Sequence, residues 1–310
     1  MPQLYAALTD LVVPEEAADT PLPRLPVCER LLTRARRRSA PPDWRRWALA
    51  HARLEAPPGD LPIGRTLARR HGAPDTAEAT WFVATPVHFV AGFSSVHFDR
   101  DGELALPPET AGTLARRFAA EWQDPTLTLV PAGEALLLRA AGLWQVESQD
   151  PAPHAGRPLG PALPQGVDGG RLRRLMTELQ MWLHADPPRA EDGRVLNGLW
   201  LWGSGRGECH GTARWPMLAG ATDPFLAALA HDGAALADAR LECWSLAALT
   251  RGGLDFAAAD RLWFAPLAEA LAAGRLSGAE LYVAGHAFEL SRWQRLRRWR
   301  RVHPWWELAR

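Results

Sequence analysis

Hydrophobic and polar positions follow a helical period most clearly near the middle of the chain. Between Leu172 and Leu183, apolar residues recur at intervals of three and four, which gathers them on one face of an α-helix. Asp168 stands where a helix N-cap is expected, and Asp186 is followed by two prolines that stop a helix. The pattern therefore predicts one amphipathic helix between Asp168 and Asp186.

Short apolar runs on both sides of this helix have the lengths and turn signals of strands, and helical runs separate some of them. The run from Asn197 to Gly203 is apolar on both faces, which is typical of a central strand covered on both sides. This alternation predicts an α/β fold with a mixed sheet and flanking helices. The other expected strands are 81–83, 87–90, 95–98, 127–130, 135–140, 241–246 and 280–290, and the other expected helices are 42–55, 108–122, 224–230 and 260–273.

The first 75 residues differ from the rest because they are rich in proline, arginine and alanine. A short helix among proline breaks and the amphipathic run 42–55 are the elements that their pattern supports. We therefore expect two parts. Residues 1–75 form a small, mostly helical N-terminal module, and residues 76–310 form an α/β main domain that ends in an Arg/Trp-rich segment.

Composition narrows the possible functions. The 35 basic and 35 acidic side chains give a formal net charge of zero, which argues against nucleic acid as the partner because coating a duplex needs surplus positive charge. The three cysteines lack the spacing of a metal or redox pair, and the N-terminus lacks the pattern of a signal peptide. The uncharged stretch 79–98 is long enough to span a membrane, but Pro86 and Gly92 interrupt it. We expect a cytoplasmic protein with no transmembrane segment.

Four segments occur in an order that resembles one protein family. They are residues 84–88 (ATPVH), 163–168 (LPQGVD), 177–184 (TELQMWLH) and 197–203 (NGLWLWG). Together they resemble the RpfE-type regulatory proteins of proteobacteria, which are described as cofactor-independent phosphoglycerate mutase-like, and the likeness covers about residues 77–301. The resemblance implies a regulatory role and a fold partly similar to the alkaline-phosphatase/phosphoglycerate-mutase-like fold.

The residues that such mutases need are missing from the pattern. The enzymes hold two divalent metal ions with Asp and His residues, because the metals stabilise the entering and leaving oxygens of phosphoryl transfer. This chain has no Asp-His pair and no Asp-Gly pair after an N-terminal buried strand, and Asp186 stands where the family has a second histidine after His184. The resemblance therefore implies a regulatory or binding protein without the two-metal centre and without a cofactor.

Two alternatives stay open. One is an active phosphate-ester enzyme of the mutase or phosphatase type, which would require a divalent metal. Its ligands would come from the histidines and one aspartate of the family-like region, namely His88, His97, His184, Asp186 and His210. The other is a nucleic-acid- or membrane-associated adaptor that acts through the C-terminal segment.

A glycine-rich loop from Gly203 to Gly207 follows the expected strand at 197–203. Backbone N–H groups of such a loop can hold a phosphate with Arg206 as counter-charge, and ligands in α/β proteins bind beyond the carboxyl ends of strands. The loop lacks a phosphate-loop motif, which favours the alternative of a plain turn.

The strand before the loop carries two tryptophans and the chain's only asparagine. Each has two interpretations: the tryptophans either stack on a ligand or fill the core, and the asparagine either binds a ligand or caps a turn. Glu178 and His184 of the family-like segment 177–184 are added to these residues. The candidate ligand-binding residues for a phosphorylated small molecule are then Asn197, Trp200, Trp202, Gly203, Gly205, Arg206, Glu178 and His184.

No residue is assigned as catalytic, and no metal site is expected. His88 and His97 lie on neighbouring expected strands, but no ligand spacing supports a metal there, so histidines with structural or surface roles are favoured. Cys209 and His210 are a possible nucleophile and base, yet adjacent residues of a strand point to opposite sides.

The Arg/Trp-rich segment near the C-terminus is the strongest local departure from the average composition. Arginine with tryptophan suits an anionic surface, such as an acidic patch of another protein, a single-stranded nucleic acid or a membrane interface. The alternative is that the tryptophans pack on the protein body while the arginines reach solvent. The candidate partner-binding residues are Arg292, Trp293, Arg295, Arg297, Arg298, Trp299, Arg300 and Arg301.

Overall fold

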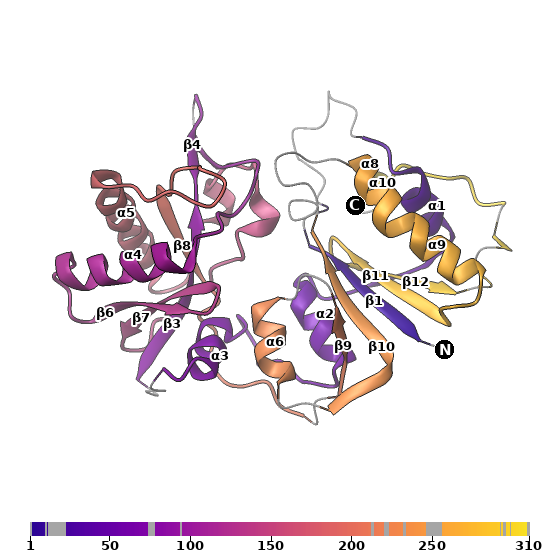
Figure 1. Cartoon of the computed structure of the whole chain (residues 1–310), viewed down its shortest axis with the longest axis horizontal. Helices are drawn as coiled ribbons and strands as arrows, with labels where there is room; N and C mark the ends of the chain where they lie inside the picture. The colour runs from indigo at the N-terminus through magenta and orange to yellow at the C-terminus, as the bar shows by residue number, and fades with distance from the viewer. Residues whose placement is uncertain are drawn as a thin grey trace. The chain divides into compact units, whose positions relative to one another are not determined.

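The computed structural model describes residues 2–9, 11, 23–73, 78–93, 95–211, 214–219, 223–231, 234–245, 256–291, 293, 296–297 and 299–308. They form two compact units, both drawn in Figure 1. The split unit consists of Met1–Glu55 and His210–Arg310, and the inserted unit consists of Ala56–Cys209. Each unit is described by itself.

Six strands form the sheet of the split unit, in the order β2-β12-β11-β1-β10-β9. Strands β9, β10, β1 and β11 are parallel, and β12 and β2 extend the sheet in antiparallel fashion. The strand β1 lies inside the sheet, with Gln3 opposite Ala239 on one side and Gly278 on the other. The bounds are β1 (Gln3–Leu8), β2 (Arg36–Ser39), β9 (Arg214–Ala219), β10 (Ala234–Trp244), β11 (Gly278–Val283) and β12 (His286–Ser291).

Helices cover both faces of this sheet (Figure 1). Leu4 and Leu281 belong to an apolar core with residues of α1 (Pro26–Arg34) and α9 (Ala265–Ala272). Tyr5 and Tyr282 point to the opposite face, because neighbouring residues of a strand alternate, and their rings pack against Trp47 of α2 (Trp44–His51). The remaining helices are α6 (Pro224–Ala230), α8 (Phe256–Ala259), a π-helical turn (Asp260–Phe264) and α10 (Trp305–Leu308).

The helix α1 is fixed at its N-terminus by a distant carboxylate. Asp260 accepts hydrogen bonds from the backbone N–H groups of Val27 at 3.0 Å and Cys28 at 2.9 Å. The first N–H groups of a helix have no partner within the helix, and a negative charge there also interacts favourably with the helix dipole. Asp260 therefore ties the start of α1 to the π-helical turn before α9.

The inserted unit contains a four-stranded antiparallel sheet in the order β6-β7-β3-β8. Its helix α3 lies along β3, α4 along β6, and α5 along β8. A separate hairpin pairs β4 with β5. The bounds are α3 (Ile63–Arg70), β3 (Ala79–Val87), β4 (Phe89–Ala91), β5 (Val96–Phe98), α4 (Pro108–Glu121), β6 (Leu127–Ala132), β7 (Ala135–Ala141), two 3-10 turns (Ala152–His154 and Gly160–Ala162), α5 (Gly169–Ala185) and β8 (Gly198–Trp202).

The α/β class with a mixed sheet and flanking helices is confirmed, and so are the helix before Asp186 and the expected strands 127–130 and 135–140, which are found in β6 and β7. Two local expectations differ from the structure. The Asp168 side chain does not cap α5 but accepts a hydrogen bond from the Gln145 N–H at 2.7 Å. The run 280–290 is two strands, because Ala284 and Gly285 have positive φ and reverse the chain.

The observed division of the chain differs from a boundary at residue 75. Residues 1–55 supply two strands, β1 and β2, to the sheet of the split unit, so they do not form a separate helical module. A single short strand is difficult to recognise when its partners lie at the other end of the chain, because strand pairing is a non-local interaction. Within the described residues, no helix combines the length and the apolar character needed to cross a membrane.

Candidate functional site

The strand β8 is buried along its whole length, as expected, but it lies at an end of its sheet and not in the centre. Its outer edge is covered, because the Ser148 hydroxyl donates a hydrogen bond to the Leu201 carbonyl at 2.7 Å. The sheet is also antiparallel, so the loop after β8 does not lie at the carboxyl edge of parallel strands. The rule that places ligands at such an edge therefore applies to the split unit and not to this loop.

The glycines of the loop after β8 serve a close approach of two backbone segments. The Gly205 N–H donates to the Leu61 carbonyl at 3.1 Å, and the Gly203 carbonyl accepts from the Gly64 N–H at 2.9 Å. A Cβ atom on Gly205 would lie 1.8 Å from the Asp60 carbonyl oxygen. The Gly205 N–H, a donor that a phosphate would need, is thus bonded to the chain itself, and Arg206 donates to the Trp144 carbonyl at 3.1 Å.

The two tryptophans of β8 belong to the core of the inserted unit. Trp200 and Trp202 are buried. Each indole N–H has an internal acceptor, since Trp200 donates to the Gln149 carbonyl at 2.8 Å and Trp202 to the Thr85 hydroxyl at 2.8 Å. Neither ring presents a free face or a free N–H group to a ligand.

The only asparagine of the chain acts as a substitute for a strand partner. Asn197 accepts a hydrogen bond from the Phe89 N–H at 2.6 Å and donates one to the Phe89 carbonyl at 2.9 Å. One side chain thereby satisfies both backbone groups of the first residue of β4. A side-chain amide is needed because both a donor and an acceptor are required at the same place.

The other polar candidates of the inserted unit are spread over separate contacts. Glu178 pairs with Arg174 at 2.9 Å, and His184 is exposed in the last turn of α5. His88 contacts the Val195 carbonyl and His97 contacts the Ser95 hydroxyl. Among the residues that the structure describes, no group of three or more His, Cys, Asp or Glu side chains is placed to hold a metal ion.

The cysteines outside this region are poor candidates for a nucleophile. Burial raises the pKa of the Cys28 thiol well above its ordinary value, and burial raises that of Cys243 to about 12. Because the thiolate is the reactive form, both remain unreactive thiols at neutral pH.

The segment after β12 lies against the C-terminal end of α1. Arg300 donates hydrogen bonds to the Thr33 carbonyl at 3.1 Å and the Ala35 carbonyl at 3.2 Å, and Arg297 donates to the Arg34 carbonyl at 3.3 Å. The last carbonyls of a helix have no partner within the helix, and cations there interact favourably with its dipole. Three other partner-binding candidates, Arg292, Arg295 and Arg298, lie outside the described residues.

The tryptophans of the same segment point to solvent. The exposed fractions are 65% for Trp293 and 78% for Trp299, and Leu296 between them is also exposed. Trp293 and Trp299 are therefore not packed on the protein body, while Arg297 and Arg300 are hydrogen-bonded to it. Only after residue 301 does a tryptophan enter the core: Trp305 is buried and donates to the Pro23 carbonyl at 3.0 Å.

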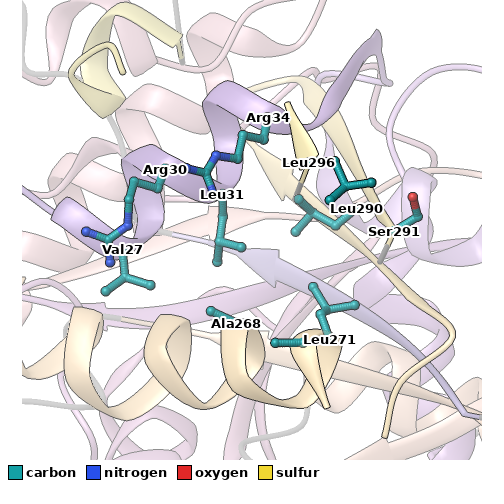
Figure 2. Close-up of a pocket in the computed structure, with 10 residues that line it drawn as sticks. Val27, Arg30, Leu31, Arg34, Ala268, Leu271, Leu290, Ser291 and Leu296 are labelled. Carbon is teal, nitrogen blue, oxygen red and sulfur yellow. The ribbon is translucent and has the colours of Figure 1, made fainter. Parts of the chain in front are cut away.

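A cavity of about 460 Å³ lies beside this segment, within the split unit (Figure 2). Helix α1 forms one side of it and helix α9 the other, and the end of β12 with Leu296 contributes the rest. The cavity is lined by Val27, Arg30, Leu31, Arg34, Ala268, Leu271, Ala272, Leu290, Ser291 and Leu296.

Two arginines, Arg30 and Arg34, line this cavity. Arg30, Arg36 and Arg301 are exposed, and none of them has an ion pair in the part of the chain that the structure describes. The Nε of Arg34 is buried and has no hydrogen-bond partner among the described residues. We call residues 293, 296–297 and 299–301 together with the C-terminal half of α1 the α1 surface.

Comparison with known proteins adds no relative. The chain matches no protein-family model, and neither curated proteins nor solved structures include a significant match. The likeness to the alkaline-phosphatase/phosphoglycerate-mutase-like fold accordingly stays a prediction.

The cavity is the feature that the sequence did not indicate. Its walls come from α1 and α9, which lie at opposite ends of the chain. The one local signal is the spacing of Arg30 and Arg34, four residues apart and thus neighbours on one side of a helix.

Proposed function

We propose that the protein is a regulatory binding protein, as its resemblance to the RpfE-type family implies, and that it binds an acidic protein partner through the α1 surface. The observation that carries this proposal is the exposure of Trp293 and Trp299 on a segment that Arg297 and Arg300 hold in place. Tryptophan and arginine are the residues most enriched among those that dominate the affinity of protein interfaces.

The charge of the surface supports an acidic partner. Arg301 follows Trp299 by two residues, and Arg30 and Arg36 lie in and just after α1; all three are exposed without ion pairs among the described residues. Carboxylates of a partner would pair with these arginines while the indoles bury apolar area. Binding of this kind weakens as the salt concentration rises, because exposed charges are screened.

Photo-crosslinking tests the proposal. A photoreactive amino acid replaces Trp299 in one variant and Val167 in another; Val167 is 82% exposed in the inserted unit and serves as the control. We expect a light-dependent adduct with an acidic protein from the variant at position 299 and none from the control. The purified partner should then bind the unmodified chain, lose most of its affinity for the double variant Trp293→Ala/Trp299→Ala, and bind more weakly at high salt.

Two results would contradict the proposal. The first is the same set of adducts from both positions. The second is a purified partner whose affinity is unchanged by the double substitution. Binding of the chain to vesicles of phosphatidylcholine and phosphatidylglycerol that requires Trp299, with no protein adduct, would replace the protein partner by a membrane surface.

The enzyme alternative has its own test. A coupled assay for interconversion of 3- and 2-phosphoglycerate, with and without added manganese, is expected to show no turnover. Metal-dependent turnover that a chelator abolishes would overturn the binding-protein proposal. The next step would then be to replace the candidate metal ligands one at a time, namely His88, His97, His184, Asp186 and His210.

A further inference from the structure

The cavity between α1 and α9 has the size of a small-molecule site. Its volume of about 460 Å³ falls within the roughly 300–1,000 Å³ that is usual for ligand pockets. Figure 2 shows Arg30, Leu31 and Arg34 along α1, facing Ala268 and Leu271 of α9. All of the lining residues belong to the split unit.

Most of the cavity wall is apolar. Val27 and Leu31 line it on the α1 side, Leu271 on the α9 side, and Leu290 and Leu296 close it at the end of β12. Two alanines of α9, Ala268 and Ala272, also line it, and their short side chains leave room that a larger residue would fill. Such a wall favours a hydrocarbon chain or ring, because apolar groups gain free energy when they leave water.

The polar part of the cavity carries positive charge and no negative charge. Arg30 and Arg34 both line it, and no Asp or Glu does in the part of the chain that the structure describes. The Nε of Arg34 is buried and lacks a hydrogen-bond partner among the described residues. A buried donor without a partner is unfavourable, and a guanidinium binds carboxylates and phosphates better than any neutral acceptor. The chemistry therefore calls for an anionic group next to the apolar wall.

We propose that this cavity binds an amphiphilic anion. The ligand has an apolar body of up to roughly 15 water-sized groups, at about 30 Å³ for each, and one carboxylate or phosphate. Arg30 and Arg34 hold the anionic group, and the leucines surround the body. A nucleotide fits poorly, since its sugar and base need several hydrogen-bond partners and, among the described residues, Ser291 is the only uncharged polar one that lines the site. Trp293 and Trp299 do not line this site, which shares Arg30 with the proposed protein contact.

A fluorescent anion with apolar rings, anilinonaphthalene sulfonate, serves as the first probe, and three ligands compete with it: decanoate, octyl phosphate and the neutral alcohol decanol. We expect the probe to bind and at least one of the two anions to displace it at much lower concentration than decanol does. Decanoate and octyl phosphate differ in the anionic group and by one carbon in the apolar tail, so an affinity difference well above the about fourfold effect of one methylene tells a carboxylate site from a phosphate site.

Three variants assign the binding to this cavity. Arg34→Gln should weaken the binding of the anions about tenfold or more, the effect of losing one charge-assisted hydrogen bond, and change decanol little. Ala268→Leu should weaken all ligands because it fills the cavity. Arg275→Gln removes an exposed arginine of the same unit that does not line the cavity, and it should change nothing.

The proposal is overturned if neither anion competes with the probe, or if decanol competes as well as the anions and Arg34→Gln has no effect. Thermal unfolding of each variant shows whether it is folded. Should Arg34→Gln fail to fold, Arg30→Gln and Ala268→Leu provide the same comparison. Crosslinking from position 299 is a separate readout, so failure of ligand binding leaves the protein contact to its own test.

Discussion

The loop after β8 and the segment after β12 contain similar kinds of residues but use them in opposite ways. In the loop region, Gly203 and Gly205 bond to the backbone of residues 61–64, and Trp200 and Trp202 are buried with their N–H groups bonded internally. In the segment after β12, Arg297 and Arg300 bond internally while Trp293 and Trp299 are exposed. Exposure and hydrogen-bond partners, and not residue type, separate a structural region from a binding surface.

The largest effect expected from this comparison is on Gly205. A Cβ atom there would lie 1.8 Å from the Asp60 carbonyl oxygen, so Gly205→Ala must displace backbone. We expect the free energy of unfolding to fall by about 3 kcal/mol, the upper part of the usual range for overpacking. Gly160→Ala is the matched control, because no atom lies within 4 Å of its added Cβ. Chemical denaturation of both variants measures the difference in the free energy of unfolding. Equal stability of the two variants would contradict a structural role for Gly205.

The next effect concerns Asn197. Asn197→Asp keeps an acceptor for the Phe89 N–H but loses the donor to the Phe89 carbonyl and places a negative charge beside that oxygen. We expect a loss of about 2 kcal/mol, within the cost of an unsatisfied buried polar group. Gln123→Glu makes the same chemical change at an exposed position and should be nearly neutral. A stable Asn197→Asp protein would point to a ligand role for the amide instead.

A half-buried carboxylate of the split unit allows a test by pH. Glu280 accepts hydrogen bonds from Trp47 at 2.6 Å and from His51 at 3.1 Å. Burial by itself raises the pKa of Glu280, but the hydrogen bonds from His51 and Trp47 and the charge of His51 outweigh it, so the pKa lies below its ordinary value of 4.5. At neutral pH, Glu280→Gln should cost about 1.5 kcal/mol, as expected for hydrogen bonds to a charged group.

The sign of the pH dependence follows from the lowered pKa. The ionised carboxylate stabilises the folded state, and this contribution is complete above the unfolded-state pKa and is lost as the pH falls through the folded-state pKa. Denaturation curves from pH 6 downward should therefore show a steeper loss of stability for the unmodified chain than for Glu280→Gln. Glu269→Gln, an exposed control in the same unit, should follow the unmodified chain. Parallel curves for the unmodified chain and Glu280→Gln would contradict the assignment.

The smallest effects on stability are expected in the segment after β12. Arg300→Ala removes hydrogen bonds to the carbonyls of Thr33 and Ala35 and should cost about 1 kcal/mol or less, the size of a charge effect at a helix end. Trp299→Ser should cost less than about 0.5 kcal/mol, because the indole is largely exposed. A larger loss for Trp299→Ser than for Arg300→Ala, measured by denaturation, would show that the exposed indole has a structural role.

Local elements with strong periodicity could be predicted from the sequence. The stripe from Leu172 to Leu183 corresponds to α5, and residues 108–122 correspond closely to α4. The sequence also singles out the glycines, tryptophans and asparagine around β8 as unusual residues. Their structural roles could not be predicted, because these roles depend on partners such as Leu61 and Phe89 that are distant in the chain.

Local patterns in the sequence predict the α/β class, the main helices and strands, and the density of arginine and tryptophan near the C-terminus, since each of these depends on neighbouring residues. Three features could be seen only in the folded chain: β1 joins a sheet with β10 and β11, the split unit encloses residues 56–209 in sequence, and α1 and α9 form a cavity with two arginines. These features depend on contacts between residues far apart in the chain, which no local pattern of hydrophobic and polar positions records.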